Sequence, residues 1–213
     1  MRLARVVIAS VVFTVSGTAV AGEPTEQPDQ PQPAPASWLL AAKLGGTFPG
    51  IFGALSASPA AELEAGYFLG PRLLVDAAVA YSQPGHEATV ADPRVSSGSY
   101  SFSLVQRDLA FFAGSKLLFP IEASDLTPYA SAGLRLHLVE QVVDGQAGGS
   151  AFGETREQGT SWGASLRGGA GWSLGPGSLV GELELSWAAM ERSVSGESDL
   201  AALGLSVGYQ LAL

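Results

Sequence analysis

Residues 162–174 read WGASLRGGAGWSL, and the residues of this stretch alternate in character. Trp, Ala, Leu, Gly, Ala, Trp and Leu fill the even positions, and Gly, Ser, Arg, Gly, Gly and Ser fill the odd ones. A period of two is typical of a β-strand with one apolar and one polar face. Trp162 and Trp172 would lie roughly 33 Å apart along such a strand, or roughly 25 Å along the normal of a bilayer at the tilt usual for barrels. Because Trp is enriched where hydrocarbon meets headgroups, the stretch predicts a membrane-spanning strand with Arg167 on its other face.

The first 21 residues predict a signal peptide rather than part of the fold. Arg2 and Arg5 form a short basic region, residues 6–15 form an apolar run, and residues 19–21 read Ala-Val-Ala, a small-residue cleavage site. The apolar run is too short to span a membrane as a helix, although a retained anchor is the alternative interpretation. The sequence holds no cysteine, so we expect no lipid on a cysteine, no disulfide and no thiolate metal site.

The composition of the chain is unusual for a water-soluble domain. Removal of Arg2 and Arg5 from the 11 Lys and Arg leaves 9 against 20 Asp and Glu, a formal charge of 9 − 20 = −11. Such a balance argues against a nucleic-acid partner, whose phosphates need a basic surface. Only 15% of residues are charged and 27 are glycine, whereas soluble domains average about 25% charged residues. A transmembrane β-barrel explains this composition, because its strands combine an apolar and a polar face.

The remaining chain divides into a tail and a strand-rich region. Residues 22–36, GEPTEQPDQPQPAPA, hold five prolines and three acids, so we expect a disordered periplasmic tail that builds no core. Residues 37–213 show the alternating pattern repeatedly and predict one domain, an all-β, eight-stranded antiparallel up-and-down transmembrane β-barrel. The predicted strands cover residues 38–44, 61–69, 73–82, 106–119, 129–138, 162–174, 179–187 and 201–213.

The gaps between these strands alternate in length, as in bacterial barrels with short periplasmic turns and long outer loops. The longer gaps are 47–59, 84–98, 141–158 and 192–199, and the short ones are 70–71, 120–127 and 175–178. With both ends of the barrel domain on the periplasmic side, every longer gap lies outside. Aromatic residues of the apolar faces then sort into two girdles. The inner girdle holds Trp38, Tyr67, Phe119, Trp172 and Tyr209, and the outer girdle holds Tyr81, Trp162 and Trp187.

Charged residues gather on the opposite face of the strands. They are Lys43, Glu62, Glu64, Asp76, Asp108, Lys116, Arg135, His137, Arg167, Glu182 and Glu184. A charge at the bilayer midplane costs about 2–4 kcal/mol, so this face is predicted to line the lumen. A soluble barrel of the lipocalin type is the alternative, but it would need the reverse polarity.

The lumen of eight strands is just wide enough for side chains to fill it, which favours an ion-paired plug over a conducting pore. In this hypothesis Arg135 and Arg167 bridge to Glu182 and Glu184, or to Asp108. A small porin or channel for small solutes remains the alternative function.

Arg107 breaks the outer apolar face close to the predicted outer interface. A lipopolysaccharide phosphate would suit its guanidinium, and an interfacial arginine without a specific ligand is the other interpretation.

Catalysis has little support in the pattern. His86 is expected in a solvated loop, and no spacing marks Ser131 or Ser165 as partners of His137 in a nucleophilic unit. We therefore expect no enzyme activity, no cofactor and no metal site, with a lipid-modifying barrel enzyme as the remaining alternative.

The end of the chain is the most specific motif. Ser206, Gly208, Tyr209, Leu211 and Leu213 combine a polar residue, a glycine and outward hydrophobic residues. This ending resembles the C-terminal β-signal that the outer-membrane assembly machinery recognises, although such signals usually end in an aromatic residue. Residues 37–213 as a whole resemble the small outer-membrane β-barrel families typified by the OmpA transmembrane domain, OmpX and OmpW.

The resemblance implies residence in the bacterial outer membrane after export through a cleaved signal peptide. The expected partners are outer-membrane lipid, lipopolysaccharide and the barrel-assembly machinery, and we expect a monomer. The roles implied by these families run from envelope integrity and adhesion to the passage of small hydrophobic compounds. An envelope-structural or surface-interaction role with a plugged lumen and long outer loops is the expected function.

Overall fold

The structure is a computed structural model that describes residues 38–49, 55–94, 96–190 and 200–213. The signal peptide predicted for residues 1–21 and the tail predicted for residues 22–36 lie outside the described residues. Among the residues described, no helix has the length and apolarity needed to cross a membrane.

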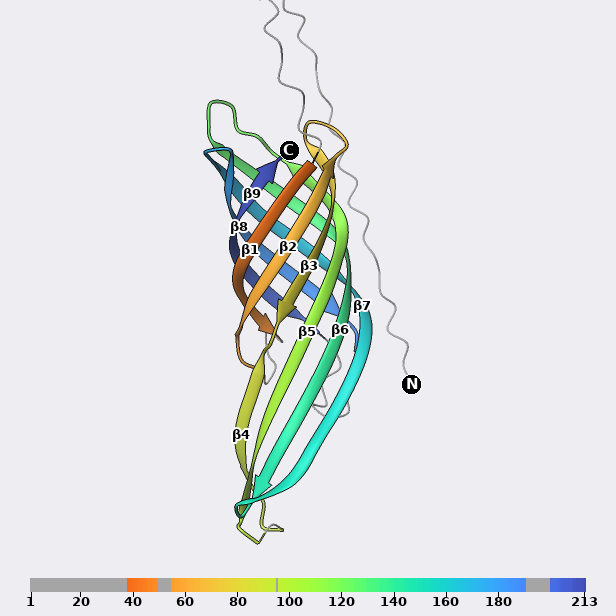
Figure 1. Ribbon diagram of the computed structural model, residues 1–213, viewed down its shortest axis with the longest axis vertical. Coiled ribbons are helices and arrows are strands. Elements are labelled where there is room, and N and C mark those ends of the chain that lie inside the picture. The colour runs from red at the N-terminus through yellow and green to blue at the C-terminus, as the bar shows by residue number, and fades with distance from the viewer. Residues whose placement is uncertain (1–37, 50–54, 95, 191–199) are drawn as a thin grey trace, which may run out of the picture. The chain divides into compact units, whose positions relative to one another are not determined.

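The described chain is a closed ring of antiparallel strands (Figure 1). Neighbours in sequence pair with each other, and β1 pairs with β9 to close the ring. β3 and β4 lie end to end along β5, so they act as one interrupted strand and the ring has eight members. The predicted eight-stranded antiparallel up-and-down barrel is confirmed. The strands are β1 (Trp38–Pro49), β2 (Ser58–Phe68), β3 (Leu73–Ser82), β4 (Gly85–Ala91), β5 (Ser99–Leu118), β6 (Leu126–Ala147), β7 (Ser150–Leu174), β8 (Gly177–Ala188) and β9 (Ala202–Ala212).

The apolar face of each strand points out of the ring and the polar face points in. On β1, Leu44 is 72% exposed while its neighbour Lys43 is 2% exposed. On β8, Leu183 is 48% exposed while Glu182 is 4% exposed. This polarity is the reverse of what a water-soluble barrel requires, because leucine on the outer wall gains nothing from contact with water. The lipocalin-type alternative is therefore wrong.

Short turns and the two ends of the barrel share one rim. Backbone hydrogen bonds join Trp38 and Leu213 in both directions, at 3.1 Å from the Trp38 nitrogen and 2.8 Å from the Leu213 nitrogen. β2 and β3 are joined at this rim by residues 69–72, and β7 and β8 by Gly175 and Pro176. Gly175 has φ 61°, a left-handed conformation that glycine adopts without steric cost.

An arm of four strands projects from the opposite rim (Figure 1). β5, β6 and β7 run for 20, 22 and 25 residues, whereas β1 and β8 have 12 each. Their ladders continue beyond the ring, with β4 beside β5, until the β6–β7 hairpin turns at Gly148 and Gly149. Both glycines have positive φ, 57° and 82°, which a tight two-residue hairpin turn requires.

The arm corrects the prediction of long outer loops at residues 84–98 and 141–158. Most of these residues are strand, and His86 lies in β4 rather than in a solvated loop. The prediction was wrong because polar residues with Gly are compatible with a loop or a strand, and each strand here finds a backbone ladder partner in its neighbour. The β-branched residues Val139, Val142 and Val143 of β6 were the signal available in the sequence, because such residues favour strands.

Candidate functional site

The inward faces of the strands collect charged side chains inside the ring. Seven of the predicted lumen residues are at most 5% exposed: Lys43, Glu64, Asp76, Lys116, His137, Arg167 and Glu182. The other four are slightly more accessible, with side chains 10–14% exposed: Glu62, Asp108, Arg135 and Glu184. Closure of the ring brings together side chains that lie as far apart in sequence as Lys43 and Glu182.

Lys43 forms three of the ion pairs in this network. Its ammonium donates to Glu62 at 3.0 Å, Glu64 at 2.6 Å and Glu182 at 2.8 Å. Lys116 contacts the other oxygen of Glu64. Three donors of one ammonium thus meet three carboxylates, which compensates for its removal from water.

Arg167 joins β7 to strands on both sides of the lumen. Its two terminal nitrogens donate to the two oxygens of Glu62 at 3.0 and 3.1 Å, a bidentate pair. Its guanidinium also lies 3.9 Å from the centre of the Phe112 ring, within range of a cation–π interaction. Glu182 and Glu184 are farther away, at 3.9 and 3.8 Å.

The structure confirms some of the ion pairs predicted from sequence and contradicts others. Arg135 contacts Glu184, one of the expected partners. Glu182 and Glu184 are secondary contacts of Arg167, and its main partner Glu62 was not expected. Asp108 bonds with the Nδ1 atom of His137 at 2.9 Å rather than with either arginine, so that part of the hypothesis is wrong. Glu62 was missed because β2 and β7 are not adjacent in the sheet, and only closure of the ring brings them face to face.

The rings of Phe112 and Tyr129 point inward and complete the packing, and no role was predicted for either. A Cβ on Gly133 would lie 2.7 Å from the Phe112 ring, and one on Gly169 would lie 2.6 Å from the Tyr129 ring. The rings therefore occupy space left by inward glycines of neighbouring strands. The Tyr129 hydroxyl donates to Glu182 at 2.8 Å. An inward glycine opposite an aromatic residue was the available sequence signal.

Several buried polar atoms lack a hydrogen-bond partner in the described structure. They include Asp76 Oδ1, Arg135 Nε and His137 Nε2. The other oxygen of Asp76 accepts a bond from Ser131 at 3.4 Å. No group of three or more His, Asp or Glu suited to a metal ion is found in the described part of the chain.

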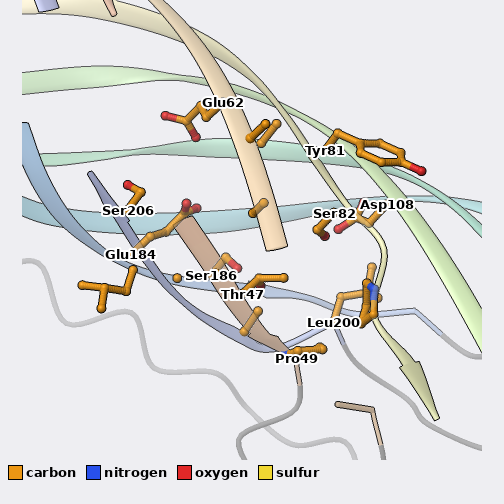
Figure 2. A pocket seen from close by; sticks show the side chains of 18 of the residues that line it. Thr47, Pro49, Glu62, Tyr81, Ser82, Asp108, Glu184, Ser186, Leu200 and Ser206 are labelled. Carbon is orange, nitrogen blue, oxygen red and sulfur yellow. The ribbon is translucent and has the colours of Figure 1, made fainter. Parts of the chain in front are cut away.

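A cavity opens at the end of the lumen from which the arm projects (Figure 2). The space between its lining residues is about 880 Å³, a volume that includes open solvent. Ser82 and Asp108 lie side by side on one wall, as their register on β3 and β5 requires, and Glu184 lies on another wall (Figure 2). Arg135 and His137 also line it.

Arg107 lies on the outer face of β5, where the arm leaves the ring. Its side chain is 48% exposed and donates to Glu140 at 2.9 Å. Arg156 and Gln158 donate to the second oxygen of Glu140 at 3.1 and 3.2 Å. The hydrogen bonds from Gln158 and then Arg107 hold the pKa of the Glu140 carboxyl below its usual range. Arg107 thus has an intramolecular partner, which neither sequence interpretation included.

The residues predicted to form the girdles lie on the outer wall. Exposed fractions are 52% for Trp38, 42% for Tyr67, 45% for Tyr81, 48% for Phe119, 67% for Trp162, 60% for Trp172 and 55% for Trp187. Tyr209 is half-buried and donates to the carbonyl of Leu174 at 2.7 Å. The predicted assembly-signal residues Ser206, Gly208 and Leu211 belong to β9, where an added Cβ on Gly208 would lie 2.7 Å from Lys43.

No protein-family model and no curated protein matches the chain. Among solved structures, it is similar to Neisserial surface protein A, with 18% identity and a TM-score of 0.51, over 83% of this chain and 97% of that one. A major outer membrane protein from Thermus thermophilus matches with 13% identity, 82% and 99% coverage and a TM-score of 0.49. The attachment invasion locus protein Ail of Yersinia pestis matches with 11% identity, 82% and 97% coverage and a TM-score of 0.43. The fold is that of the small eight-stranded outer-membrane β-barrels.

Proposed function

We propose that the chain is an integral protein of the bacterial outer membrane with a lumen closed by ion pairs. In this proposal it is exported through a cleaved signal peptide and serves an envelope-structural or surface-interaction role through its outer arm. The observation that carries the proposal is the inverted polarity of the ring, with exposed leucine and tryptophan outside and paired charges inside. Only hydrocarbon makes such an outer wall favourable.

Insertion in the membrane is tested by heat modifiability. Outer-membrane fractions are run on SDS gels with and without boiling, because a folded barrel migrates differently from its unfolded chain. We expect two mobilities, and an N-terminus at Gly22 by mass spectrometry. A protein found only in soluble fractions, with one mobility, contradicts the proposal.

Closure of the lumen is supported by the Lys43 and Arg167 contacts, which cross the ring between β1, β2, β7 and β8. Eight strands leave an interior that side chains can fill. Purified protein in planar bilayers is therefore expected to give no stable conductance. Defined single-channel steps would replace this proposal by that of a small solute channel.

A catalytic role is not part of the proposal. His137 bonds with Asp108, whereas the hydroxyls of Ser131 and Ser165 donate to Asp76 and Glu184. An activity screen on lipid A and phospholipid, with His137→Ala as the control, tests this point. Turnover by the wild type that the variant lacks would overturn it.

We further propose lipopolysaccharide as the lipid partner of the outer rim. Arg107 and Arg156 flank Glu140 just beyond the leucines of the outer wall, so a phosphate could exchange for the carboxylate at either guanidinium. Arg107→Gln is expected to weaken retention of lipopolysaccharide during purification, whereas Arg94→Gln on the arm is not. Equal retention in both variants contradicts this contact.

We propose that the end of β9 is the signal for the barrel-assembly machinery. We also propose that the protein is a monomer. Tyr209→Ala is expected to lower the yield of the folded form in the outer membrane while leaving refolding in detergent possible. The molecular mass of the purified complex, corrected for bound detergent, tests the oligomeric state.

A further inference from the structure

The cavity at the arm end of the lumen is lined by more carboxylates than cations. Its wall holds two cations, Lys43 and Arg135, against four carboxylates, Glu62, Asp108, Glu182 and Glu184. Arg167, which does not line the cavity, pairs with Glu62 of this wall. With Arg167 included and His137 neutral, the wall sums to 3 − 4 = −1.

Two carboxylates of this wall are more accessible than the carboxylate deeper in the lumen. The side chains of Asp108 and Glu184 are 14% and 13% exposed, whereas Glu64 deeper in the lumen is fully buried. The bond of Asp108 goes to a histidine, which is charged only when protonated. Arg135 and Ser165 donate to Oε1 of Glu184, so its Oε2 and the Asp108 carboxylate keep acceptor capacity toward the cavity.

An unpartnered buried group gives an independent indication of a ligand. His137 is 2% exposed and lines the cavity, and its Nε2 atom has no hydrogen-bond partner in the described structure. When Nδ1 donates its proton to Asp108, Nε2 is left as an acceptor. Nearly every buried polar atom in a folded protein has a partner, so Nε2 of His137 is an acceptor available to a donor on this side of the lumen.

The other lining residues of the cavity indicate the chemistry of a ligand that could bind there. Thr47, Ser82 and Ser186 supply hydroxyls, and Leu55, Pro84 and Leu200 supply apolar surface. An ammonium has donors and no acceptor, which suits a wall rich in carboxylates.

We propose that this cavity binds a small organic cation, a primary ammonium with a short apolar body. The ammonium pairs with Asp108 and Glu184, and its carbon chain packs on the apolar part of the wall. The site adjoins the ion pairs that close the lumen, since Lys43 lines the same cavity, but the proposed binding does not depend on whether the barrel conducts.

The test compares three probes of similar length and different charge. The full chain, folded in detergent micelles at pH 7, is titrated with n-butylammonium, n-butanol and butyrate by calorimetry and saturation-transfer NMR, with empty micelles subtracted. We expect saturable binding of the amine and at least about tenfold weaker binding of the alcohol and the acid, since one charged hydrogen bond accounts for about a factor of ten.

Variants then locate the binding. Ala80 lines the cavity, so Ala80→Leu is expected to abolish binding by filling the space without changing any charge. Asp108→Asn is expected to weaken it about tenfold. Glu154→Gln removes a carboxylate of the arm that does not line this cavity and is expected to have no effect. Folding of each variant is verified by its gel mobility without boiling.

Three outcomes overturn the proposal. The first is that no probe binds the folded wild type, and the second is that the alcohol binds as well as the amine. The third is that binding persists unchanged in folded Ala80→Leu. The first two need no variant, so the proposal is testable even where a substitution prevents folding.

Discussion

Replacement of Arg167 by methionine is the sharpest test of the ion-paired lumen. The arginine side chain is 0% exposed, forms two hydrogen bonds to Glu62 at 3.0 and 3.1 Å and lies 3.9 Å from the Phe112 ring centre. Removal of one partner leaves the buried carboxylate without its bidentate donor. Such a loss costs about 3–5 kcal/mol of unfolding free energy.

The assay is urea unfolding of the barrel in lipid vesicles, followed by tryptophan fluorescence and by gel mobility without boiling. Arg156→Met is the matched control, because that side chain is 52% exposed and its pairs with Glu140 and Glu154 are expected to contribute at most about 1 kcal/mol.

A double variant separates the pair from general packing. Arg167→Met with Glu62→Gln removes both charges, and we expect it to be more stable than the sum of the two single losses by about 1–3 kcal/mol. If Arg167→Met costs no more than Arg156→Met, or if the two single losses simply add, the ion pair does not stabilise the lumen and the reasoning is refuted.

Three other predictions address the facing of residues, the membrane belt and the arm. Gly169→Ala places a Cβ against the Gly181 carbonyl oxygen and is expected to destabilise the barrel by about 1–3 kcal/mol. The Cβ of Gly168→Ala meets nothing within 4 Å, so this variant is expected to be neutral. Equal effects of the two variants in urea unfolding contradict the register. Lipids brominated close to the headgroup are expected to quench the fluorescence of Trp162 and Trp172 more than lipids brominated at the chain end, and the reverse order contradicts the two girdles. The Glu140 carboxyl has its pKa held below 4.5 by Gln158 and Arg107, so its ionised contacts are fully present above about pH 4.5 and are lost as the pH falls through the lowered pKa. In ¹³C NMR, Gln158→Ala is expected to raise that midpoint toward 4.5, and an unchanged midpoint contradicts the assignment of the cause.

The strands of the ring were predictable from sequence because the alternation of apolar and polar residues is a local pattern. Each spanning strand alternates over about ten residues, so the faces of Leu166 and Arg167 follow from neighbours along the chain. The short turn at Gly175 and Pro176 is equally local. The arm was less predictable, since polar residues such as those of β4 are compatible with loop or strand, and the choice depends on an available ladder partner.

Within the site, sequence assigned the charged residues to one face but not to their partners. Arg135 and Glu184 were paired correctly, because β6 and β8 flank the same strand, β7, and come directly before and after it along the chain. Glu62 was not paired with Arg167, because the two strands that carry them meet only across the lumen. Phe112 was overlooked because its role depends on Gly114 and Gly133, which provide the space for its ring.

The sequence by itself determined which side of each predicted strand of the ring faces outward, and hence that the outer wall is apolar and the interior charged. That information is local, since the side-chain period of an extended chain is two residues. Only the tertiary structure decided how the interior charges combine: Lys43 among three glutamates, Arg167 on Glu62, Asp108 on His137, and an acidic cavity at the arm end. Closure of the ring fixes these contacts, because the distance across a barrel depends on strand number and tilt, which no segment of the chain encodes alone.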